Sequence, residues 1–265
     1  MQLKPDSTNM ASMRTSKNNL ANAVQIRFKQ YGKHEDLEEA IALRLEALEL
    51  CPPGHPLHSM SLGNLASVVQ ILFEQYGKDK DLEEAIVLQR KSLKLYTPGH
   101  PGRSMGLNNL AHGFETRFNQ YGKHEDLEEA IILQQEALQL RPPGHPLRSM
   151  SLGNLASVVR IRFEQYGKDK DLEDAIVLQR ETLKLRPPGH PYHSQSLMLL
   201  GSMFLTRFGH LGQHDSLDQA MSLYAKATQN ALQPSLLQSF HCARGWALQA
   251  NKYRHPLSSK LMMPF

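Results

Sequence analysis

Residues 62–99 read LGNLASVVQILFEQYGKDKDLEEAIVLQRKSLKLYTPG, and this stretch decides the fold. Its first half carries apolar side chains at the three- and four-residue spacing of one face of an α-helix. The members of that stripe are Leu62, Leu65, Ala66, Val69, Phe73 and Tyr76. Gly77 follows directly, and glycine there is typical of the left-handed residue that ends a helix. The pattern predicts a first helix that ends at Tyr76.

The second half of the stretch predicts a second helix. Asp81 and Glu84 have the spacing of a capping box, in which the first side chain caps the helix. The same pair recurs as Asp36 with Glu39, Asp126 with Glu129 and Ser216 with Gln219, and in weaker form as Asp171 with Asp174. The turn Thr97-Pro98-Gly99 is expected to stop the helix. Each stretch of this kind is therefore a helix–turn–helix.

The stretch repeats with a period of 45 residues. Tyr-Gly occurs at 31, 76, 121 and 166, Asn-Leu-Ala begins at 19, 64, 109 and 154, and Pro-Gly-His-Pro begins at 53, 98, 143 and 188. Residues 55–101 and 145–191 differ at only 8 of 47 positions, which indicates duplication of a pair of repeats. Two helices cannot bury their apolar faces alone, so neighbouring repeats are expected to stack and share a core.

The period defines the domain organisation. We expect an N-terminal tail at 1–14, a solenoid at 15–233, a capping or next-repeat helix at 234–250 and a second tail at 251–265. The five repeats fall at about 11–52, 56–97, 101–142, 146–187 and 191–230. The last repeat is degenerate, since Leu199-Leu200-Gly201 replaces Asn-Leu-Ala. A pattern-poor C-terminal end is also a candidate surface for self-association.

The composition limits the classes of partner and the cellular compartment that the sequence favours. The chain has 265 residues, of which 40% are hydrophobic and 21% charged, and 30 basic residues are interleaved with 26 acidic ones. A net charge of +4 does not single out nucleic acid or a membrane as partner. Cys51 and Cys242 lie far apart and outside any metal-binding spacing. With no apolar segment of signal-peptide type, the sequence favours a cytoplasmic protein.

These residues resemble the tetratricopeptide repeat (TPR) family. Its first-helix pattern matches Leu62, Leu65, Ala66 and Val69, its second-helix alanine matches Ala85, and its closing proline matches Pro52, Pro142 and Pro187. The family's second-helix aromatic is Gln89 here, and each repeat is eleven residues longer. The resemblance, which is closer to the long repeats of kinesin light chains, covers about residues 15–230. It implies an all-α, right-handed superhelical solenoid of about five 45-residue repeats plus a C-terminal helix.

The resemblance is closest to tandem repeats of fungal proteins that often end in a caspase-like CHAT protease domain. In those proteins a segment similar to CARGWALQA, here residues 242–250, commonly lies just before the protease. The chain ends at Phe265, so one hypothesis is a sensor or regulatory arm of such a protease system, or a truncated fragment of it. The main prediction is a non-catalytic scaffold that binds a partner protein or peptide.

The resemblance also implies where a partner would bind. First helices of TPR arrays line a concave groove, and family groove positions fall on one asparagine per repeat in four repeats. Asparagine can hold an extended peptide backbone, since its amide both donates and accepts. The alternative is that these side chains bridge neighbouring helices. The predicted groove residues are Asn19, Asn64, Asn109 and Asn154, with Asn18, Asn108, Ser67, Gln70, His112, Ser157 and Arg160.

Two other residue types each allow two interpretations. A series of arginines that includes Arg27, Arg117, Arg162 and Arg207 could form a basic strip for acidic peptides, or could pair with repeat carboxylates such as Glu83 and Glu173. The thirteen histidines recur in the same turns without convergent partners, which favours a role in turns over metal binding. We expect no catalytic residues, no metal and no cofactor, because no catalytic or phosphate-binding motif occurs.

Overall fold

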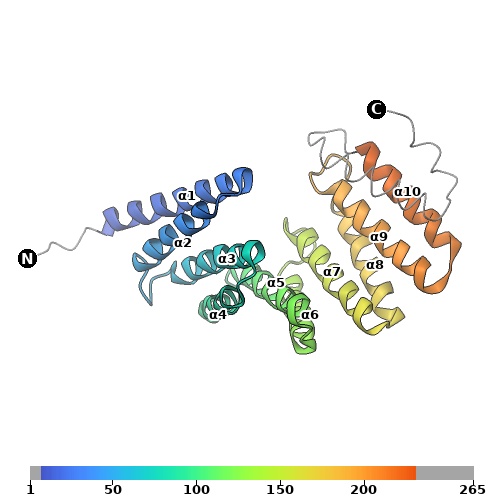
Figure 1. Ribbon diagram of the computed structural model, residues 1–265, viewed down its shortest axis with the longest axis horizontal. Helices are drawn as coiled ribbons and strands as arrows, with labels where there is room; N and C mark the ends of the chain where they lie inside the picture. The colour runs from blue at the N-terminus through green and yellow to red at the C-terminus, as the bar shows by residue number, and fades with distance from the viewer. Residues whose placement is uncertain (1–6, 231–265) are drawn as a thin grey trace, which may run out of the picture. The chain divides into compact units, whose positions relative to one another are not determined.

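The computed structural model describes residues 7–230 and consists there of ten α-helices joined by short turns (Figure 1). They are α1 (Ser7–Tyr31), α2 (His34–Glu49), α3 (His58–Tyr76), α4 (Asp79–Leu95), α5 (Arg103–Tyr121), α6 (His124–Gln139), α7 (Arg148–Tyr166), α8 (Asp169–Lys184), α9 (His193–Leu211) and α10 (His214–Asn230). Each odd-numbered helix packs against the even-numbered helix that follows it, as predicted for helix–turn–helix repeats.

The chain divides into two compact parts, residues 1–140 and 141–265. In the N-terminal part, α2 packs on α3 and α4 on α5, so the three hairpins form one stack. In the C-terminal part, α8 packs on α9. The predicted all-α fold of stacked hairpins is confirmed in each part. The predicted helix at 234–250, the tail at 251–265 and Cys242 lie outside the described residues.

The first helix, α1, begins within the segment that the sequence analysis predicted to be an N-terminal tail. Residues 7–14, assigned to a tail, form the first two turns of α1. A tertiary contact lies at the end of this segment. Arg14 reaches the turn after α2, where its Nη1 lies 3.9 Å from Sγ of Cys51.

The predicted capping boxes are wrong. The second helices begin two residues before the predicted caps, and Lys33, Lys78, Lys123 and Lys168 precede them without a side-chain cap. The aspartates lie inside the first turn, where a negative charge still favours the helix dipole. Three of them, Asp36, Asp126 and Asp171, are buried and accept hydrogen bonds from arginines of the preceding helix. A long-range ion pair therefore replaces the local cap.

Both turns of each repeat have a fixed backbone. Gly77 ends α3 with φ 69° and donates its N–H to the carbonyl of Phe73 at 2.7 Å, which confirms the predicted left-handed cap. In the turns between repeats, the histidine of Pro-Gly-His-Pro accepts the N–H two residues further on. These bonds join His55 to Leu57, His100 to Gly102, His145 to Leu147 and His190 to Tyr192, at 3.0–3.1 Å. The turn role predicted for these histidines is confirmed.

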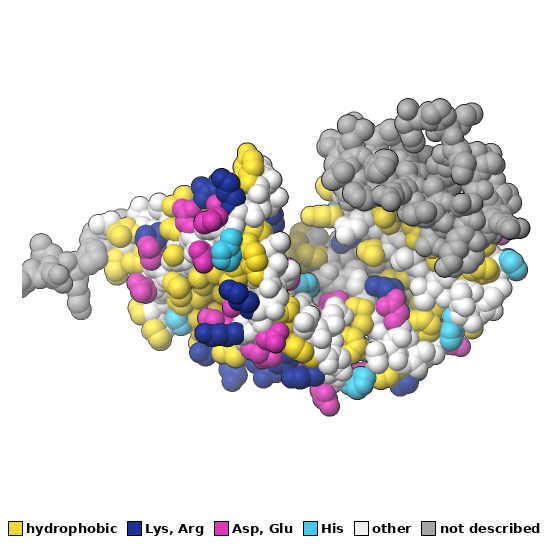
Figure 2. Space-filling model, viewed as in Figure 1, with side chains coloured by type: hydrophobic (Ala, Val, Ile, Leu, Met, Phe, Trp, Pro, Cys, Tyr) yellow, Lys and Arg dark blue, Asp and Glu magenta, His cyan; other side chains and the backbone are white. Residues whose placement is uncertain are grey.

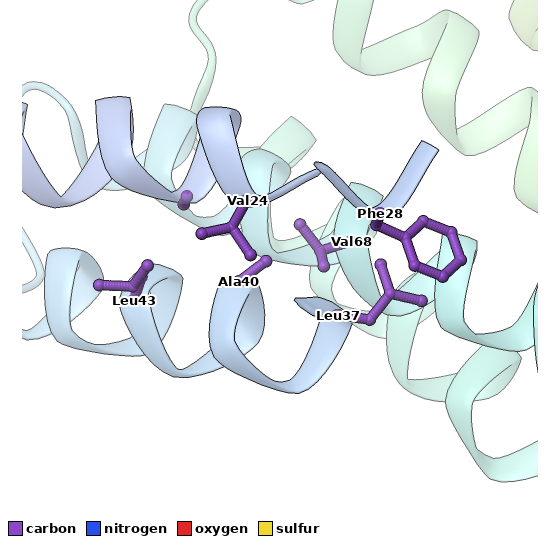
Figure 3. Close-up of a cluster of buried hydrophobic side chains, with 7 residues drawn as sticks. Val24, Phe28, Leu37, Ala40, Leu43 and Val68 are labelled. Atoms are coloured by element: carbon purple, nitrogen blue, oxygen red, sulfur yellow. The ribbon is translucent and has the colours of Figure 1, made fainter. Parts of the chain in front are cut away.

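The core runs across repeats. One cluster in the N-terminal part joins Val24 and Phe28 of α1, Leu37 and Leu43 of α2, and Val68 of α3 (Figure 3). Val68 belongs to the second repeat, so the first hairpin completes its core with a side chain from its neighbour. The expectation that adjacent repeats share a core is confirmed here.

Small residues allow the helices to approach closely. Ala66 and Ala85 are fully buried, and Oγ of Ser92 donates to the carbonyl of Ser59 at 2.7 Å. Phe73 of the predicted apolar stripe is buried, and the phenylalanines at the same position of the other repeats are buried at 28, 118 and 163 and half-buried at 208. Tyr76 was placed on the same apolar stripe, but its side chain is 38% exposed because it lies on the last turn of the helix.

Candidate peptide-binding groove

A hollow of about 280 Å³ lies on the first helices of the N-terminal part. It is lined by residues of α1 and α3, by Arg44 of α2 and by Leu57 just before α3: Arg14, Thr15, Asn18, Asn19, Asn22, Arg44, Leu57, Met60 and Asn64. A second hollow, of about 380 Å³, continues along α1 and is lined by Asn22, Gln25, Ile26 and Lys29. We call the two hollows together the α1 groove. The structure thus brings three of the predicted groove residues, Asn18, Asn19 and Asn64, to one surface.

Arg44 of α2 lines the first hollow of the α1 groove. Its side chain is 5% exposed, and it donates from Nη1 to Oδ1 of Asn18 at 2.5 Å and from Nη2 to Oδ1 of Asn22 at 2.6 Å. Nη2 also approaches Oε1 of Gln25 at 3.4 Å, while Nε is buried with no partner. Burial lowers the pKa of Arg44, since no carboxylate compensates for the lost water.

Arg14 lies at the other end of the first hollow. Its Nη1 is 3.1 Å from Nε2 of His55, whose Nδ1 already accepts the N–H of Leu57. A neutral imidazole has one acceptor nitrogen, so His55 cannot accept from both groups. Like Arg44, Arg14 has no ion pair with a carboxylate within residues 7–230.

The side-chain amides of the four predicted asparagines make no hydrogen bond with other protein groups of the described residues. Within the described residues, no hydrogen bond joins the side chain of Asn19, Asn64, Asn109 or Asn154 to another protein group. Asn19 is exposed and the other three are half-buried. Within the described residues, no hydrogen bond of these amides caps or bridges a neighbouring helix. Their role in binding stays a prediction.

The remaining predicted residues of the N-terminal part make bonds of their own. Asn108 is buried and donates to the carbonyl of Ser104 one turn earlier at 2.7 Å, and Ser67 donates to the carbonyl of Gly63 at 2.9 Å. Gln70 accepts from Nε2 of Gln89 at 3.0 Å and also bonds His112. Asn108 is thus bonded to its own helix and Gln70 to α4, whereas His112 is exposed.

Three predicted residues lie in the C-terminal part, on α7. Asn154 and Ser157 are half-buried, and Arg160 forms an ion pair with Glu164 one turn away. They occupy the same repeat positions as Asn64, Ser67 and Gln70. They are described with their own part and do not belong to the α1 groove.

The interpretation of the repeated arginines as ion-pair partners is confirmed. Arg117 donates to Asp126 at 2.6 and 2.7 Å and also pairs with Glu83, and Arg207 pairs with Glu173. Arg27 pairs with both Asp36 and Glu39. Basic and acidic side chains accordingly lie beside one another on the surface seen in Figure 2. These arginines are neutralised locally and do not form a free basic strip.

Several residues that line the hollows were not predicted, among them Arg14, Met60 and the buried Arg44. Arg44 lies on a second helix, and only first helices were expected to line the groove. Comparing the repeats would have singled out Arg44, because the equivalent residues of the other four repeats are Gln89, Gln134, Gln179 and Tyr224. All four of these side chains are buried. A cation at this buried position is found only in the first of the five repeats.

The second repeat lacks the arginine of the ion-pair series. Leu72 stands where the fourth repeat has Arg162, and Oδ2 of Asp81 is buried with no hydrogen-bond partner. We expect Leu72→Arg to raise the free energy of unfolding by about 1 kcal/mol, since it supplies a charged hydrogen bond to Asp81. Urea denaturation would measure the gain. The same substitution made together with Asp81→Asn should lose it, and a gain that survives in the double variant would contradict the expected pairing.

Within residues 7–230, no group of three or more His, Cys, Asp or Glu side chains is placed to hold a metal ion. None of the described helices is both long and apolar enough to cross a membrane.

Comparison with known proteins agrees with the helix pairs. The tetratricopeptide repeat family profile matches residues 14–57. A structure of a Podosopora anserina protein with nearly identical TPR-like repeats of kinesin-light-chain type is 18% identical, covers 84% of this chain and 98% of its own, and has a TM-score of 0.57. A thermophilic TPR protein of Thermus thermophilus is 16% identical, covers 90% and 99%, and has a TM-score of 0.60. PilF of Pseudomonas aeruginosa is 18% identical, covers 95% and 97%, and has a TM-score of 0.56.

A comparison with curated protein sequences gives no match. The described residues therefore have the fold of tetratricopeptide-repeat proteins, with neighbours that include kinesin-light-chain-like repeats. Repeat proteins of this kind generally use their extended surfaces for protein–protein interaction.

Proposed function

We propose that this protein is an interaction scaffold that binds an extended segment of a partner protein in the α1 groove. The observation that carries the proposal is the first hollow, which the unbonded amides of Asn19 and Asn64 line together with the buried Arg44. Amides that make no bond within the protein are available to both the N–H and the C=O of a peptide backbone. Such contacts hold an extended chain without reading each side chain.

The second hollow extends the proposed binding surface. Ile26 is 58% exposed on its wall and offers an apolar contact between the polar groups of Asn22 and Lys29. A binding site of this kind combines a hydrophobic contact with a few convergent polar groups. Asn109 on α5 supplies the next unbonded amide of the same stack.

The test is a selection of peptides on the intact chain. A library of random twelve-residue peptides displayed on phage would be selected against the protein, and the recovered peptides titrated by calorimetry. We expect the triple variant Asn19→Ala, Asn64→Ala and Asn109→Ala to bind them at least about tenfold more weakly, equivalent to about 1.4 kcal/mol for lost amide contacts. Asn119→Ala, which changes an exposed asparagine on α5 away from the repeated asparagine position, is the control. Equal affinity of the triple variant and the wild type would place binding elsewhere.

The cellular setting that we propose is the cytoplasm. Cys51 is a buried free thiol, as suits a reducing compartment.

A further inference from the structure

A stripe of four exposed residues follows one side of α1 and lies outside the α1 groove. It consists of Leu20, Ala23, Arg27 and Tyr31. Their spacing of three, four and four residues places them on one face of the helix. None of the four lines either hollow. We call this stripe the end face.

The equivalent face of other first helices is covered by the second helix of the preceding hairpin. In this way α2 packs on α3, α4 on α5 and α8 on α9. α1 is the first helix that the structure describes, so no such helix covers the end face. Leu20 is 49% exposed, whereas its equivalents Leu65, Leu110 and Leu200 are 3–4% exposed. A terminal repeat usually has a polar outer face, but the end face keeps the leucine of an internal repeat.

A carboxylate from a covering helix is one contact that the end face lacks. In α5 the equivalent of Arg27 is Arg117, which pairs with Glu83 of α4 at 2.9 Å and with Asp126 of its own hairpin at 2.6 Å. An equivalent pair joins α9 to α8 at 3.1 Å. Within residues 7–230, the carboxylates that Arg27 contacts belong to its own hairpin, and Arg27 is exposed where Arg117 is half-buried.

The tyrosine of the end face lacks a partner of the same origin. In α5 the equivalent of Tyr31 is Tyr121, whose hydroxyl donates to Asp79 at the start of α4. This bond raises the pKa of Tyr121 to about 12. Tyr31 is 70% exposed, against 40% for Tyr121.

A small residue in the middle of the end face leaves room for a helix to approach. The equivalent of Ala23 in α5 is Gly113, where an added Cβ would lie 3.0 Å from Cγ1 of Ile86 of α4. The two helices are therefore in close contact at this point. A separate helix can make room for the methyl group of Ala23 by a shift of a few tenths of an ångström.

The covering helices share one sequence pattern, which describes the missing partner. Each has His or Asp at its first position, Glu four residues later, Ile three residues after that and Leu after seven more. In α4 these residues are Asp79, Glu83, Ile86 and Leu93. The isoleucine and leucine of α2, at 41 and 48, pack against the cluster that contains Leu65 of α3.

A second copy of the chain has no free helix of this kind within residues 7–230. α2, α4 and α8 are already packed on the first helix that follows each of them. In α6 and α10 the equivalents of Ile86 are Ile131 and Met221, and both are buried. The chemistry of the end face therefore points to a helix from a different protein.

We propose that the end face docks an α-helix of a different protein, antiparallel to α1, whose exposed side carries the pattern of α4. The glutamate of that helix would pair with Arg27, and the acidic group one turn earlier would accept from the hydroxyl of Tyr31. Its isoleucine and leucine would cover the apolar half of the end face, as in helix-in-groove recognition. This interface is separate from the α1 groove and goes beyond the proposed function.

The test uses a fluorescein-labelled peptide with the sequence of α4, residues 79–95. A lactam between the exposed side chains of Lys80 and Glu84 holds it helical, because so short a helix is marginal in water. The intact chain is titrated into the peptide and binding is followed by fluorescence anisotropy. We expect Leu20→Glu to weaken binding at least about tenfold. Leu45→Glu on α2 changes a leucine of nearly equal exposure, 46%, and should bind as the wild type does.

A second comparison tests the ion pair. Arg27→Gln keeps a hydrogen-bond donor for the buried Asp36, so this variant should retain the cooperative urea unfolding of the wild type. A peptide with Glu83→Gln should bind the wild type about threefold more weakly, as expected for one surface ion pair. It should bind Arg27→Gln as well as the unaltered peptide does, because the pair is already absent.

Three results would overturn the inference: no binding of the constrained peptide, equal affinities of Leu20→Glu and Leu45→Glu for it, or the same effect of Glu83→Gln on the wild type and on Arg27→Gln. Sedimentation of the intact chain without peptide tests the other occupant. We expect the wild type and Leu20→Glu to sediment alike, whereas a dimer that Leu20→Glu abolishes would assign the end face to a second copy. Since the end face lines neither hollow, a failure here leaves the proposed groove function to its own test.

Discussion

Replacing Leu37 with alanine is expected to lower the free energy of unfolding of the N-terminal part by about 3 kcal/mol. Leu37 is 0% exposed and lies between Phe28 of α1 and Val68 of α3 (Figure 3). Truncation removes the transfer free energy of the side chain and leaves a cavity where three helices meet. Because the cavity borders two repeats, the loss should reach the contact between the first and second hairpins.

Leu45→Ala on the same helix is the matched control. Its side chain is 46% exposed, so it buries much less apolar area and its removal should cost less than about 1 kcal/mol. Urea denaturation followed by circular dichroism would compare the two variants. Similar losses for both would show that the cluster around Leu37 does not hold the hairpins together.

The second large effect concerns the ion pair of the fourth repeat. Arg162→Leu is expected to cost about 2 kcal/mol, because it removes charged hydrogen bonds and leaves a buried carboxylate without them. Arg162 donates to Asp171 from Nε at 3.0 Å and from Nη2 at 2.8 Å, and Asp171 is 5% exposed. The leucine itself fits, since Leu72 occupies the same position of the nearly identical second repeat.

A double-mutant cycle with Asp171→Asn would measure this coupling. The double variant should be more stable than the sum of the single losses predicts, because it contains no unpaired buried charge. Thermal unfolding of the four proteins provides the comparison. Strictly additive losses would mean that Arg162 acts through packing of its stem and not through its charge.

Helix pairs and turns could be predicted from the sequence because their signals are local. The stripe from Leu62 to Phe73 and the glycine at 77 lie within one helix and one turn, and both behave as expected. The capping boxes failed because the competing partner is distant in sequence. Asp36 has Arg27 nine residues away on another helix, and a local motif cannot anticipate that contact.

The candidate site was also predictable only in part, because some of its residues depend on contacts between helices that a local pattern does not reveal. The period alone placed Asn19 and Asn64 on equivalent faces, and both line the first hollow. It also placed Asn108 there, although this side chain turns back onto its own helix. To predict Arg44 as a groove residue, one would have to know which second-helix side chain reaches between the helices to the amides of α1. Comparing Arg44 with the equivalent residue of the next repeat, Gln89, would have shown that the first repeat has a cation where the next has a neutral side chain.

The uniform turns between repeats have an evolutionary consequence. Each closes through its own histidine and glycine, and residues 145–191 nearly duplicate residues 55–101. Recombination between the two matching gene segments would delete or add 90 residues and join α2 to the equivalent of α3 with nearly the same contact residues. The number of repeats could therefore change in steps of two while Arg44, which lies outside both duplicated segments, would be retained.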